Sequence, residues 1–449
     1  MRFMISMLCA AFMTTTTHAK EDLISAQDRE AAVAELGQLI EDNYFDAEAG
    51  ARLNAELQAF ANSAEANDID MGNLLAGVLT DRLQPQDRHF DIRWRGVDEI
   101  TRTHAQRAAE DAAAAANTYT PDRWTSLRRR NFSFSDVSVL NGNIGYLNLT
   151  GFAPIEPAER TARAALDFIA NTETVIIDLR ENGGGSPDMV QYLLSHFLPA
   201  GEERLYNTFL PRHEARIEMS TLAEHPAGNR PDVPLYILVS PDSLSAAEAL
   251  AYHLQAMGRA RIIGEVTAGG GNPGEIFLAS SGYSIFIPTA TSVSPLTGTN
   301  WGGEGVQPDI TVSAVDALDR ALLEIHSYIA ATAEDPGEML AADWRVGWLG
   351  ARLPPWQPDT EALEAFVGQY GPRRVWLENG RLMYQREGRE VNELIPMVPG
   401  TFRFANSEDY LVDFPGWDSG RAAALVIRLE TAMTEPPPRE GESQQESPA

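Results

Sequence analysis

The sequence is nearly free of cysteine and of lysine. Cys9 is the single cysteine among 449 residues, and Lys20 is the single lysine. If the first 19 residues are removed, no cysteine remains, which excludes disulfide bonds and cysteine-based catalysis in the mature chain. Lys20 would then lie at the extreme N-terminus, so every other fixed cation is an arginine.

Positive charge is scarce as well. The chain has 35 Lys and Arg residues against 64 Asp and Glu residues, a net charge of -29. Binding to nucleic acid or to anionic lipid needs clustered Lys and Arg, so neither partner is expected. The 44% hydrophobic and 22% charged residues are typical of a globular protein, and the length allows more than one domain.

The N-terminus has the pattern of a secretory signal. Arg2 precedes an apolar run from Phe3 to Met13, which is too short to span a bilayer, since that needs about 20 apolar residues. Thr17-His18-Ala19 is a Thr-x-Ala end of the kind that precedes a cleavage site, here after Ala19. We predict a signal peptide over residues 1–19, a periplasmic or secreted mature chain and no stable membrane insertion of that chain. A disordered, uncleaved tail is the alternative, and acylation at Cys9 is disfavoured by the residues that precede it.

Apolar spacing predicts a mixed α/β chain. From about residue 28 to 83 apolar residues recur at helical spacing, and the Ala-rich stretch 104–118 is either another helix or a spacer. Strands separated by helices then favour a largely parallel sheet. The expected elements are strands over 144–149, 175–179, 235–239 and 261–264, with helices over 187–197 and 245–257.

The C-terminal part has a different pattern. From about Ala342 we expect short strands with Gly and Asn turns, among them a hairpin at Asn379-Gly380. Residues 435–449 are rich in Pro, Glu, Ser and Gln, which predicts a disordered tail.

Two local motifs carry possible chemistry. Asp178-Leu-Arg-Glu-Asn-Gly-Gly-Gly185 leaves a predicted strand, and glycine-rich N–H donors at such a turn suit a phosphate or an oxyanion. No lysine is available to complete a nucleotide-binding loop, and a turn that merely needs glycine is the alternative. Ser245 opens the next predicted helix, as a nucleophile on a sharp turn does. Its Ser-x-x-Glu spacing to Glu248 equally fits a helix capping box.

Four motifs in order give the chain a resemblance to peptidase family S41, which includes the tail-specific proteases. They are the Asp178–Gly185 segment, Ser243-Leu-Ser-Ala-Ala-Glu248, the stretch from Gly258 to Gly271, and Gly305-Val-Gln-Pro-Asp-Ile310. The resemblance implies an α/β crotonase-like sheet-and-helix core with an N-terminal helical unit and a small C-terminal β-rich appendage. The domains expected are 20–130 (helical), 131–335 (catalytic core) and 336–434 (β-rich).

The resemblance also implies which base activates the serine. In the processing-protease branch a lysine follows the Gly-Glu-x-Thr motif, and Gly270 stands at that place here. The tricorn-like and retinoid-binding-like branch uses a histidine in an Asp-x-His-aromatic motif, which Asp87-Arg-His89-Phe matches. Histidine is a suitable base near neutral pH, although without the motif His89 would be a structural histidine. Arg88 replaces a serine found in some members.

A carboxylate that orients the base is harder to assign. Many relatives have an acid directly after the Trp that corresponds to Trp301, whereas here the acid is displaced to Glu304. Glu304 or Asp87 could orient His89, with Glu304 slightly favoured.

The resemblance therefore implies a serine peptidase acting on a peptide or protein substrate. Ser245 would attack the carbonyl, His89 would move the proton, and N–H groups at Gly184, Gly185 and Ala246 would hold the oxyanion. No metal or organic cofactor and no separate PDZ domain are expected. The alternatives are a non-catalytic module that binds an apolar ligand and an esterase-like hydrolase; oligomeric state is not predicted.

Overall fold

The structure is a computed structural model that describes residues 23–115, 124–350, 352–353, 356–407, 410–417, 420–429 and 432–433. By its internal contacts the chain divides into two compact units, which are Met1–Val139 with Gly145–Thr311 and Leu140–Ile144 with Val312–Ala449. The predicted signal peptide and the predicted disordered tail lie outside the described residues. The domain boundaries and the cellular location stay predictions. Among the described residues, no helix is long and apolar enough to cross a membrane.

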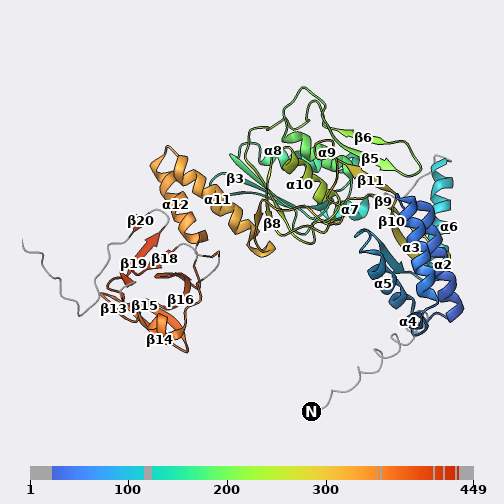
Figure 1. Ribbon diagram of the computed structural model, residues 1–449. Coiled ribbons are helices and arrows are strands. Elements are labelled where there is room, and N and C mark those ends of the chain that lie inside the picture. The colour runs from blue at the N-terminus through green and yellow to red at the C-terminus, as the bar shows by residue number, and fades with distance from the viewer. Residues whose placement is uncertain are drawn as a thin grey trace, which may run out of the picture. The chain divides into compact units, whose positions relative to one another are not determined.

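The first unit begins with a layer of helices packed on a small sheet (Figure 1). The helices are α2 (Ala26–Asn43), α3 (Ala47–Ala61), α4 (Ala64–Asn67), α5 (Gly72–Leu83) and α6 (Val97–Ala115). The antiparallel sheet has the order β1-β10-β9, with β1 at Asp91–Trp94, β9 at Gly274–Leu278 and β10 at Tyr283–Pro288. Their apolar faces meet in what we call the N-terminal core, which includes Leu36, Leu79, Phe90 and Ile285. The helical spacing predicted this layer.

A larger sheet forms the centre of the first unit. Its order is β12-β8-β7-β4-β3-β2, with β2 at Phe134–Leu140, β3 at Ile144–Leu149, β4 at Thr174–Asp178, β7 at Leu235–Val239, β8 at Arg261–Gly264 and β12 at Ile310–Thr311. Strands β4, β7, β8 and β12 pair in parallel. Helices α8 (Ile155–Phe168), α9 (Pro187–His196) and α10 (Ala246–Ala256) pack with it (Figure 1). Their shared interior is called the central core and includes Ile177, Ile237, Ala247 and Leu250.

The first unit also contains shorter elements. A third sheet has the order β11-β5-β6, and two short helices precede β2. Their bounds are β5 (Leu205–Pro211), β6 (Ile217–Ser220), β11 (Ala290–Val293), α7 (Thr125–Arg129) and η1 (Asn131–Ser133).

The second unit contains helices followed by one antiparallel sheet. The helices are η2 (Ala314–Asp316), α11 (Ala317–Thr332), α12 (Pro336–Gly350) and α13 (Thr360–Glu364). The sheet runs in sequence order from β13 to β20: Gly368–Tyr370, Arg373–Glu378, Arg381–Arg386, Val391–Val398, Thr401–Phe404, Tyr410–Asp413, Val426–Leu429 and Ala432–Met433. Its core is rich in aromatic side chains, among them Phe366, Phe402 and Phe414.

The two predictions for this unit have different outcomes. The Asn-Gly hairpin is confirmed, because Glu378 pairs with Arg381 across Asn379 and Gly380, both at positive φ (52° and 75°). We expected strands from about Ala342, but helix α12 continues to Gly350. The expectation is therefore wrong for residues 342–350. Trp344 and Trp348, four residues apart, are both buried on one helical face, so their spacing indicated a helix.

Candidate active site

Ser245 lies on a sharp turn between the end of β7 and the start of α10. Its backbone has φ 58° and ψ -114°, a region that a side chain other than glycine rarely adopts and that costs about 1–3 kcal/mol. Ser243 fixes the turn, since its hydroxyl donates to the Leu179 carbonyl (2.8 Å) and accepts from the Ser240 N–H (2.9 Å). Strain held in place in this way is what presents a nucleophilic serine at the mouth of a strand-to-helix turn.

Glu248 organises the loops around Ser245. This carboxylate is completely buried and accepts four hydrogen bonds. The donors are the N–H groups of Ser245 (2.8 Å), Gly269 (2.6 Å) and Gly270 (2.8 Å) and the Thr267 hydroxyl (2.5 Å). The backbone half of the proposed capping box is therefore present, but Glu248 also joins the turn to a second loop. Ser-x-x-Glu spacing alone could not reveal that second role.

The glycine-rich segment after β4 lies directly against this turn. An added Cβ on Gly184 would meet the Ser245 Cβ at 2.8 Å and the Ala246 nitrogen at 3.1 Å. Gly185 has φ 141° and lies so close to the Phe152 carbonyl that a side chain there would collide with it. Asn182, which is completely buried, holds the segment by donating to the Leu149 carbonyl (2.8 Å).

The three predicted oxyanion donors differ in availability. The Gly184 N–H already donates to the Asn182 side-chain oxygen (2.9 Å), so it is engaged inside the loop. In the described part of the chain no hydrogen bond is recorded for the N–H groups of Gly185 and Ala246, and both residues line the pocket that contains Ser245. Of the three predicted donors, the N–H groups of Gly185 and Ala246 are therefore the available ones, and Gly184 packs closely against the Ser245 turn.

The first part of the motif, Asp178-Leu179-Arg180, has a structural use. The Asp178 carboxylate is buried, pairs with the Arg180 guanidinium (2.6 Å) and accepts from the Tyr146 hydroxyl (2.7 Å). This arrangement fixes the end of β4, from which the glycine segment departs.

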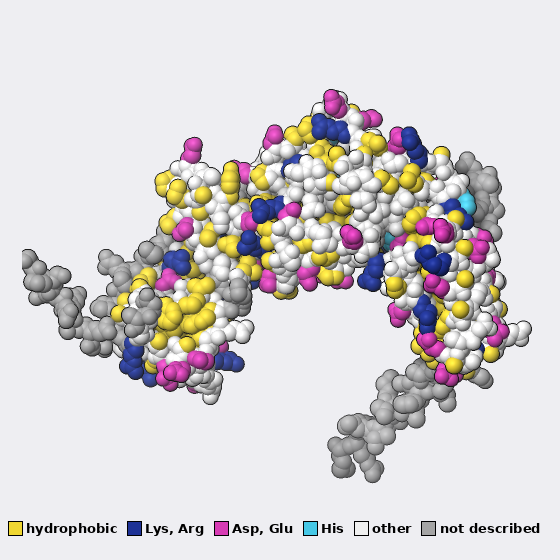
Figure 2. Space-filling view, in the orientation of Figure 1, with side chains coloured by type: hydrophobic (Ala, Val, Ile, Leu, Met, Phe, Trp, Pro, Cys, Tyr) yellow, Lys and Arg dark blue, Asp and Glu magenta, His cyan; other side chains and the backbone are white. Residues whose placement is uncertain are grey.

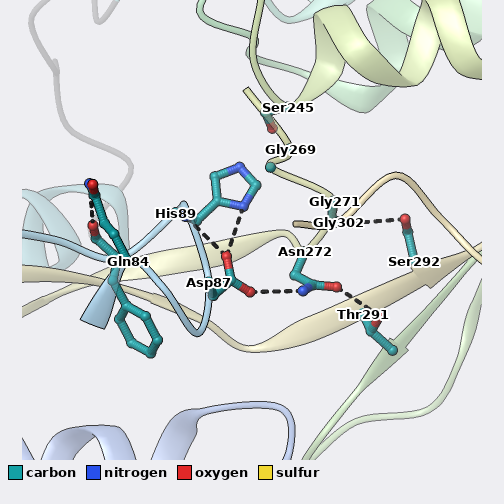
Figure 3. Close-up of polar contacts among 12 residues, drawn as sticks. Gln84, Asp87, His89, Ser245, Gly269, Gly271, Asn272, Thr291, Ser292 and Gly302 are labelled. Atoms are coloured by element: carbon teal, nitrogen blue, oxygen red, sulfur yellow. Dashed lines mark hydrogen bonds and ion pairs between the residues drawn. The ribbon is translucent and has the colours of Figure 1, made fainter. Parts of the chain in front are cut away.

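His89 and Asp87 lie next to each other just before β1, and Figure 3 shows the His89 ring between Asp87 and Ser245. Asp87 Oδ1 accepts from the His89 backbone N–H (3.0 Å) and lies 3.7 Å from ring atom Nδ1. The His89 side chain is 7% exposed, and its Nδ1 makes no hydrogen bond to any described residue. A separation of 3.7 Å exceeds a hydrogen bond, but such contacts often tighten only with substrate bound.

The His89 ring occupies the space beside Gly270. A Cβ added to Gly270 would lie 2.8 Å from both Cε1 and Nε2 of the ring and 2.5 Å from the Leu244 Cδ1. In one branch of family S41 a lysine stands at the position of Gly270. Here the His89 ring lies in the space that a side chain at residue 270 would occupy. The absence of a side chain at residue 270 is what allows His89 to reach the loop beside Ser245.

Glu304 lies away from this arrangement. It is exposed, and the hydrogen bond recorded for it uses its carbonyl oxygen, which accepts from the Gln307 side chain (2.9 Å). The preceding Trp301 is buried, and its indole N–H donates to the Gly270 carbonyl (3.0 Å). The structure therefore brings Asp87 beside His89, not Glu304, because Trp301 anchors the loop and the residues after it turn toward solvent. The catalytic roles of Ser245, His89 and Glu304 stay predictions.

An amide network supports Asp87 and was missed by sequence reasoning. The Asn272 side chain donates to Asp87 Oδ2 (2.7 Å) and accepts from the Thr291 hydroxyl (2.7 Å), as Figure 3 shows. Asn300 donates to the Ser292 carbonyl (2.7 Å) and contacts the same Thr291 hydroxyl (3.2 Å). These residues come from three separate loops and strands, and no local spacing connects them to Asp87.

Four other histidines are buried in surroundings that disfavour their charged form. Burial lowers the pKa of His196, His225 and His326 to about 4 and that of His253 to about 3. A general base becomes a cation when it accepts a proton, which these sites oppose. His104 and His213 lie outside the lining of the pocket that contains Ser245, so among the described histidines His89 is the one placed for that role.

Ser245 and His89 line one pocket with a volume of about 740 Å³. Its wall near Ser245 includes Gly185, Ala246 and Trp301, and its apolar lining includes Phe209, Ile276 and Phe286. Among the described residues no group of three or more His, Cys, Asp or Glu side chains is placed to hold a metal ion. The pocket thus combines a strained serine, a histidine with a carboxylate behind it, and two N–H groups.

Comparison with known proteins covers the central part of the chain. Residues 143–312 match the model of "Peptidase family S41". The chain is 29% identical over 188 residues to carboxyl-terminal-processing peptidase 3, chloroplastic, of Arabidopsis thaliana, covering 40% of this chain and 34% of that protein. It is 30% identical over 184 residues to a carboxy-terminal-processing protease of Bartonella bacilliformis, covering 38% and 39%. The matched region therefore spans well under half the length of these two relatives.

Solved structures resemble the chain more distantly. A lipoprotein from Streptococcus agalactiae has a TM-score of 0.43 at 13% identity, covering 68% of this chain and 98% of that one. The photosystem II D1 C-terminal processing protease has a TM-score of 0.39 at 16% identity, covering 65% and 94%. The observed arrangement is mixed α/β, with N-terminal helices and a C-terminal antiparallel sheet.

Proposed function

The central part of this chain belongs to peptidase family S41, and we propose that the protein is a serine peptidase that hydrolyses peptide bonds with Ser245 as its nucleophile. One observation carries the proposal: a serine in a strained turn shares a pocket with a histidine whose ring fits against Gly270. A structural capping serine would need neither the pocket nor the histidine.

The proposed reaction proceeds in two steps. The Ser245 hydroxyl oxygen attacks the carbonyl carbon of the scissile bond while His89 accepts the hydroxyl proton. The Gly185 and Ala246 N–H groups donate to the oxygen that gains negative charge. His89 then gives its proton to the leaving amine, and an ester to Ser245 remains. A water molecule, deprotonated by His89, attacks that ester. His89 then returns the proton to the departing Ser245 oxygen, which releases the new carboxyl end of the peptide and restores the serine hydroxyl.

In this mechanism Asp87 stabilises the cationic form of His89. Its carboxylate already faces Nδ1 across 3.7 Å, and Asn272 fixes its second oxygen. Asp87 replaces Glu304, which we favoured from the sequence, since Glu304 is exposed. We further propose that the chain belongs to the histidine-using branch of the family and that its core has a crotonase-like fold. A cleaved signal peptide and a periplasmic or secreted location remain part of it.

A second candidate is a binding module for an apolar ligand. The observation that favours it is the apolar lining of the pocket by Phe209, Ile276 and Phe286. An esterase-like hydrolase would use the same serine and differ only in substrate.

A fluorophosphonate probe separates a serine hydrolase from a binding module, and cleavage of peptides then separates a peptidase from an esterase. We expect the folded wild-type protein to be labelled at Ser245 and not at Ser243, with the site found by peptide mapping. Ser245→Ala is the matched control and should remain unlabelled while giving an unchanged circular dichroism spectrum. Labelling at Ser243, or none in a folded sample, would count against the mechanism. Tight binding of an apolar ligand without cleavage of any peptide in a broad library would favour the binding module.

A further inference from the structure

The pocket that contains Ser245 is basic at one side, although the chain as a whole is strongly acidic. Arg88, Arg93 and Arg95 line it, against the single acidic side chain of Asp91. Acidic residues outnumber basic ones by 64 to 35 in the sequence. Figure 2 shows that Asp and Glu side chains lie interspersed with Arg over the visible surface of the molecule. Three arginines on one wall of a pocket are therefore a local reversal of the overall charge.

The position of these arginines follows from the fold. In a strand, successive side chains point to opposite faces. Ile92 is buried in the N-terminal core and Trp94 packs against it, so the alternate residues Asp91, Arg93 and Arg95 face the pocket. The neighbouring strand β10 adds Ser284, the register partner of Arg93. Arg88 reaches the same wall from the loop that carries His89.

The three guanidinium groups differ in how far they are already engaged. Arg93 pairs with Asp91 (2.6 Å). Arg95 donates to the Ser284 hydroxyl (3.4 Å) and lies 3.9 Å from the Glu99 carboxylate. Arg88 is exposed, and no hydrogen bond or ion pair to any described residue is recorded for it. Arg88 is thus the cation in the pocket wall that is available to a ligand.

The opposite side of the pocket floor is apolar. Phe286 on β10 and Ile276 on β9 are register partners, and Ile276 is 57% exposed. The floor of the pocket thus changes from basic at β1 to apolar at β9. A peptide bound in the pocket would therefore meet a cation beside β1 and an apolar surface beside β9.

We propose that Arg88, supported by Arg93, binds a carboxylate group of the peptide substrate and so sets which peptides are cleaved. The carboxylate belongs either to an Asp or Glu side chain or to the end of the peptide chain. Guanidinium and carboxylate form charge-assisted, often bidentate hydrogen bonds, which favour this pairing over a neutral amide. This inference rests on the proposed peptidase function and names its substrate class.

The test uses matched pairs of internally quenched peptides. In one set a Glu at each position in turn is replaced by Gln, and in the other the free C-terminal carboxylate is replaced by an amide. We expect the wild-type protein to cleave one acidic member with a kcat/KM about fivefold higher than that of its neutral partner, the upper range for an exposed ion pair. The set that shows the preference identifies the source of the carboxylate.

Arg88→Gln should lower that ratio to about one, because it removes the charge that distinguishes the acidic peptide from its neutral partner. Arg88→Glu should reverse the preference toward peptides with Lys in place of the Glu. Arg216→Gln is the matched control, because Arg216 is exposed, pairs with Glu218 and lies outside the pocket lining. Raising NaCl from about 0.1 M to about 1 M shortens the Debye length from about 10 Å to about 3 Å and should reduce the preference.

Two results would overturn the inference. One is a wild-type protein that cleaves acidic and neutral partners equally well. The other is a preference that survives in both Arg88→Gln and the Arg88→Gln/Arg93→Gln double variant. Failure of the proposed function is distinguishable, because it would remove cleavage of every peptide and the probe labelling of Ser245 together. Each variant is therefore first tested for labelling, which also reports that its pocket is folded.

Discussion

Ser245 and His89 are held by two different hydrophobic cores. The central core surrounds the parallel sheet and includes Ala246 and Ala247, the residues that follow Ser245. The N-terminal core lies between the helices and the small sheet and includes Phe90, the residue that follows His89. The two halves of the proposed catalytic pair therefore approach each other from separately packed regions of the first unit.

The proposed roles of Ser245 and His89 also rest on different kinds of observation. The family match covers residues 143–312, which contain Ser245, the glycine segment and Glu248 but not His89. The place of His89 is instead supported by geometry, through Asp87 and the fit against Gly270. The difference teaches that related sequences support the nucleophile, whereas His89, which its motif predicted as the base, is supported further by three-dimensional contacts.

Removing either member of the pair should have the largest effect. We expect Ser245→Ala and His89→Ala each to lower kcat by on the order of 10³-fold or more, measured on a peptide that the wild-type protein cleaves. His213→Ala is the control, because His213 is exposed in the same unit. A folded His89→Ala protein with the wild-type rate would show that the N-terminal core contributes no base.

The carboxylate is the next point of comparison. Asp87→Asn keeps an oxygen that can accept the His89 N–H but removes the charge that stabilises the imidazolium, so we expect a loss in kcat on the order of 10²-fold or more. Glu304→Gln should change kcat less than about twofold, since an exposed substitution away from the site has little effect. The opposite ranking in steady-state kinetics would return the role to Glu304.

Gly270→Ala tests the contact between the two regions. The added methyl would lie 2.8 Å from the His89 ring and push it from Ser245. We expect kcat to fall about tenfold, a fraction of the 10²-fold that a 1 Å misplacement can cost. Gly77→Ala is the control, because a Cβ there meets nothing within 4 Å. An unchanged rate would mean that the precise ring position is unimportant.

The smallest effect is expected from the amide network. Thr291→Val removes the hydroxyl that donates to Asn272, the residue that holds Asp87. Because Thr291 acts on Asp87 only through Asn272, loss of this one hydrogen bond should lower kcat about threefold and leave KM unchanged. Thr101→Val, which removes an exposed helix hydroxyl, should have no effect. A change in KM alone would show that the network shapes peptide binding and not the base.

The sequence was most informative where structure is local. Strands β3, β7 and β8 have the bounds expected from the sequence, because each is a mostly buried stretch between turn residues. The hairpin at Asn379 followed from the turn that Asn-Gly favours. Helix α12 contradicts the strands expected from about Ala342, because Trp344 and Trp348 lie four residues apart on its buried face.

The site could be predicted only in part, because some of its residues come from distant parts of the sequence. Ser245 and the glycine segment follow neighbouring parallel strands, so their motifs indicated that they meet. The choice between Asp87 and Glu304 depended on where the Trp301 loop turns, and that is set by the indole hydrogen bond to Gly270. Asn272 and Thr291 support Asp87 from 185 or more residues away in the sequence, a distance over which no spacing rule applies.

The four hydrogen bonds to Glu248 have a consequence for motion. They tie the backbone of Ser245 to that of Gly269 and Gly270, so a shift of this loop would also shift the nucleophile. His89 is held by the N-terminal core and contacts the face of Gly270, while Asp87 is joined to Asn272 by a hydrogen bond. A movement of one core relative to the other would therefore change the separation of Ser245 and His89 while leaving both cores folded. A peptide bound across both walls of the pocket would favour the arrangement in which Ser245 and His89 are close together.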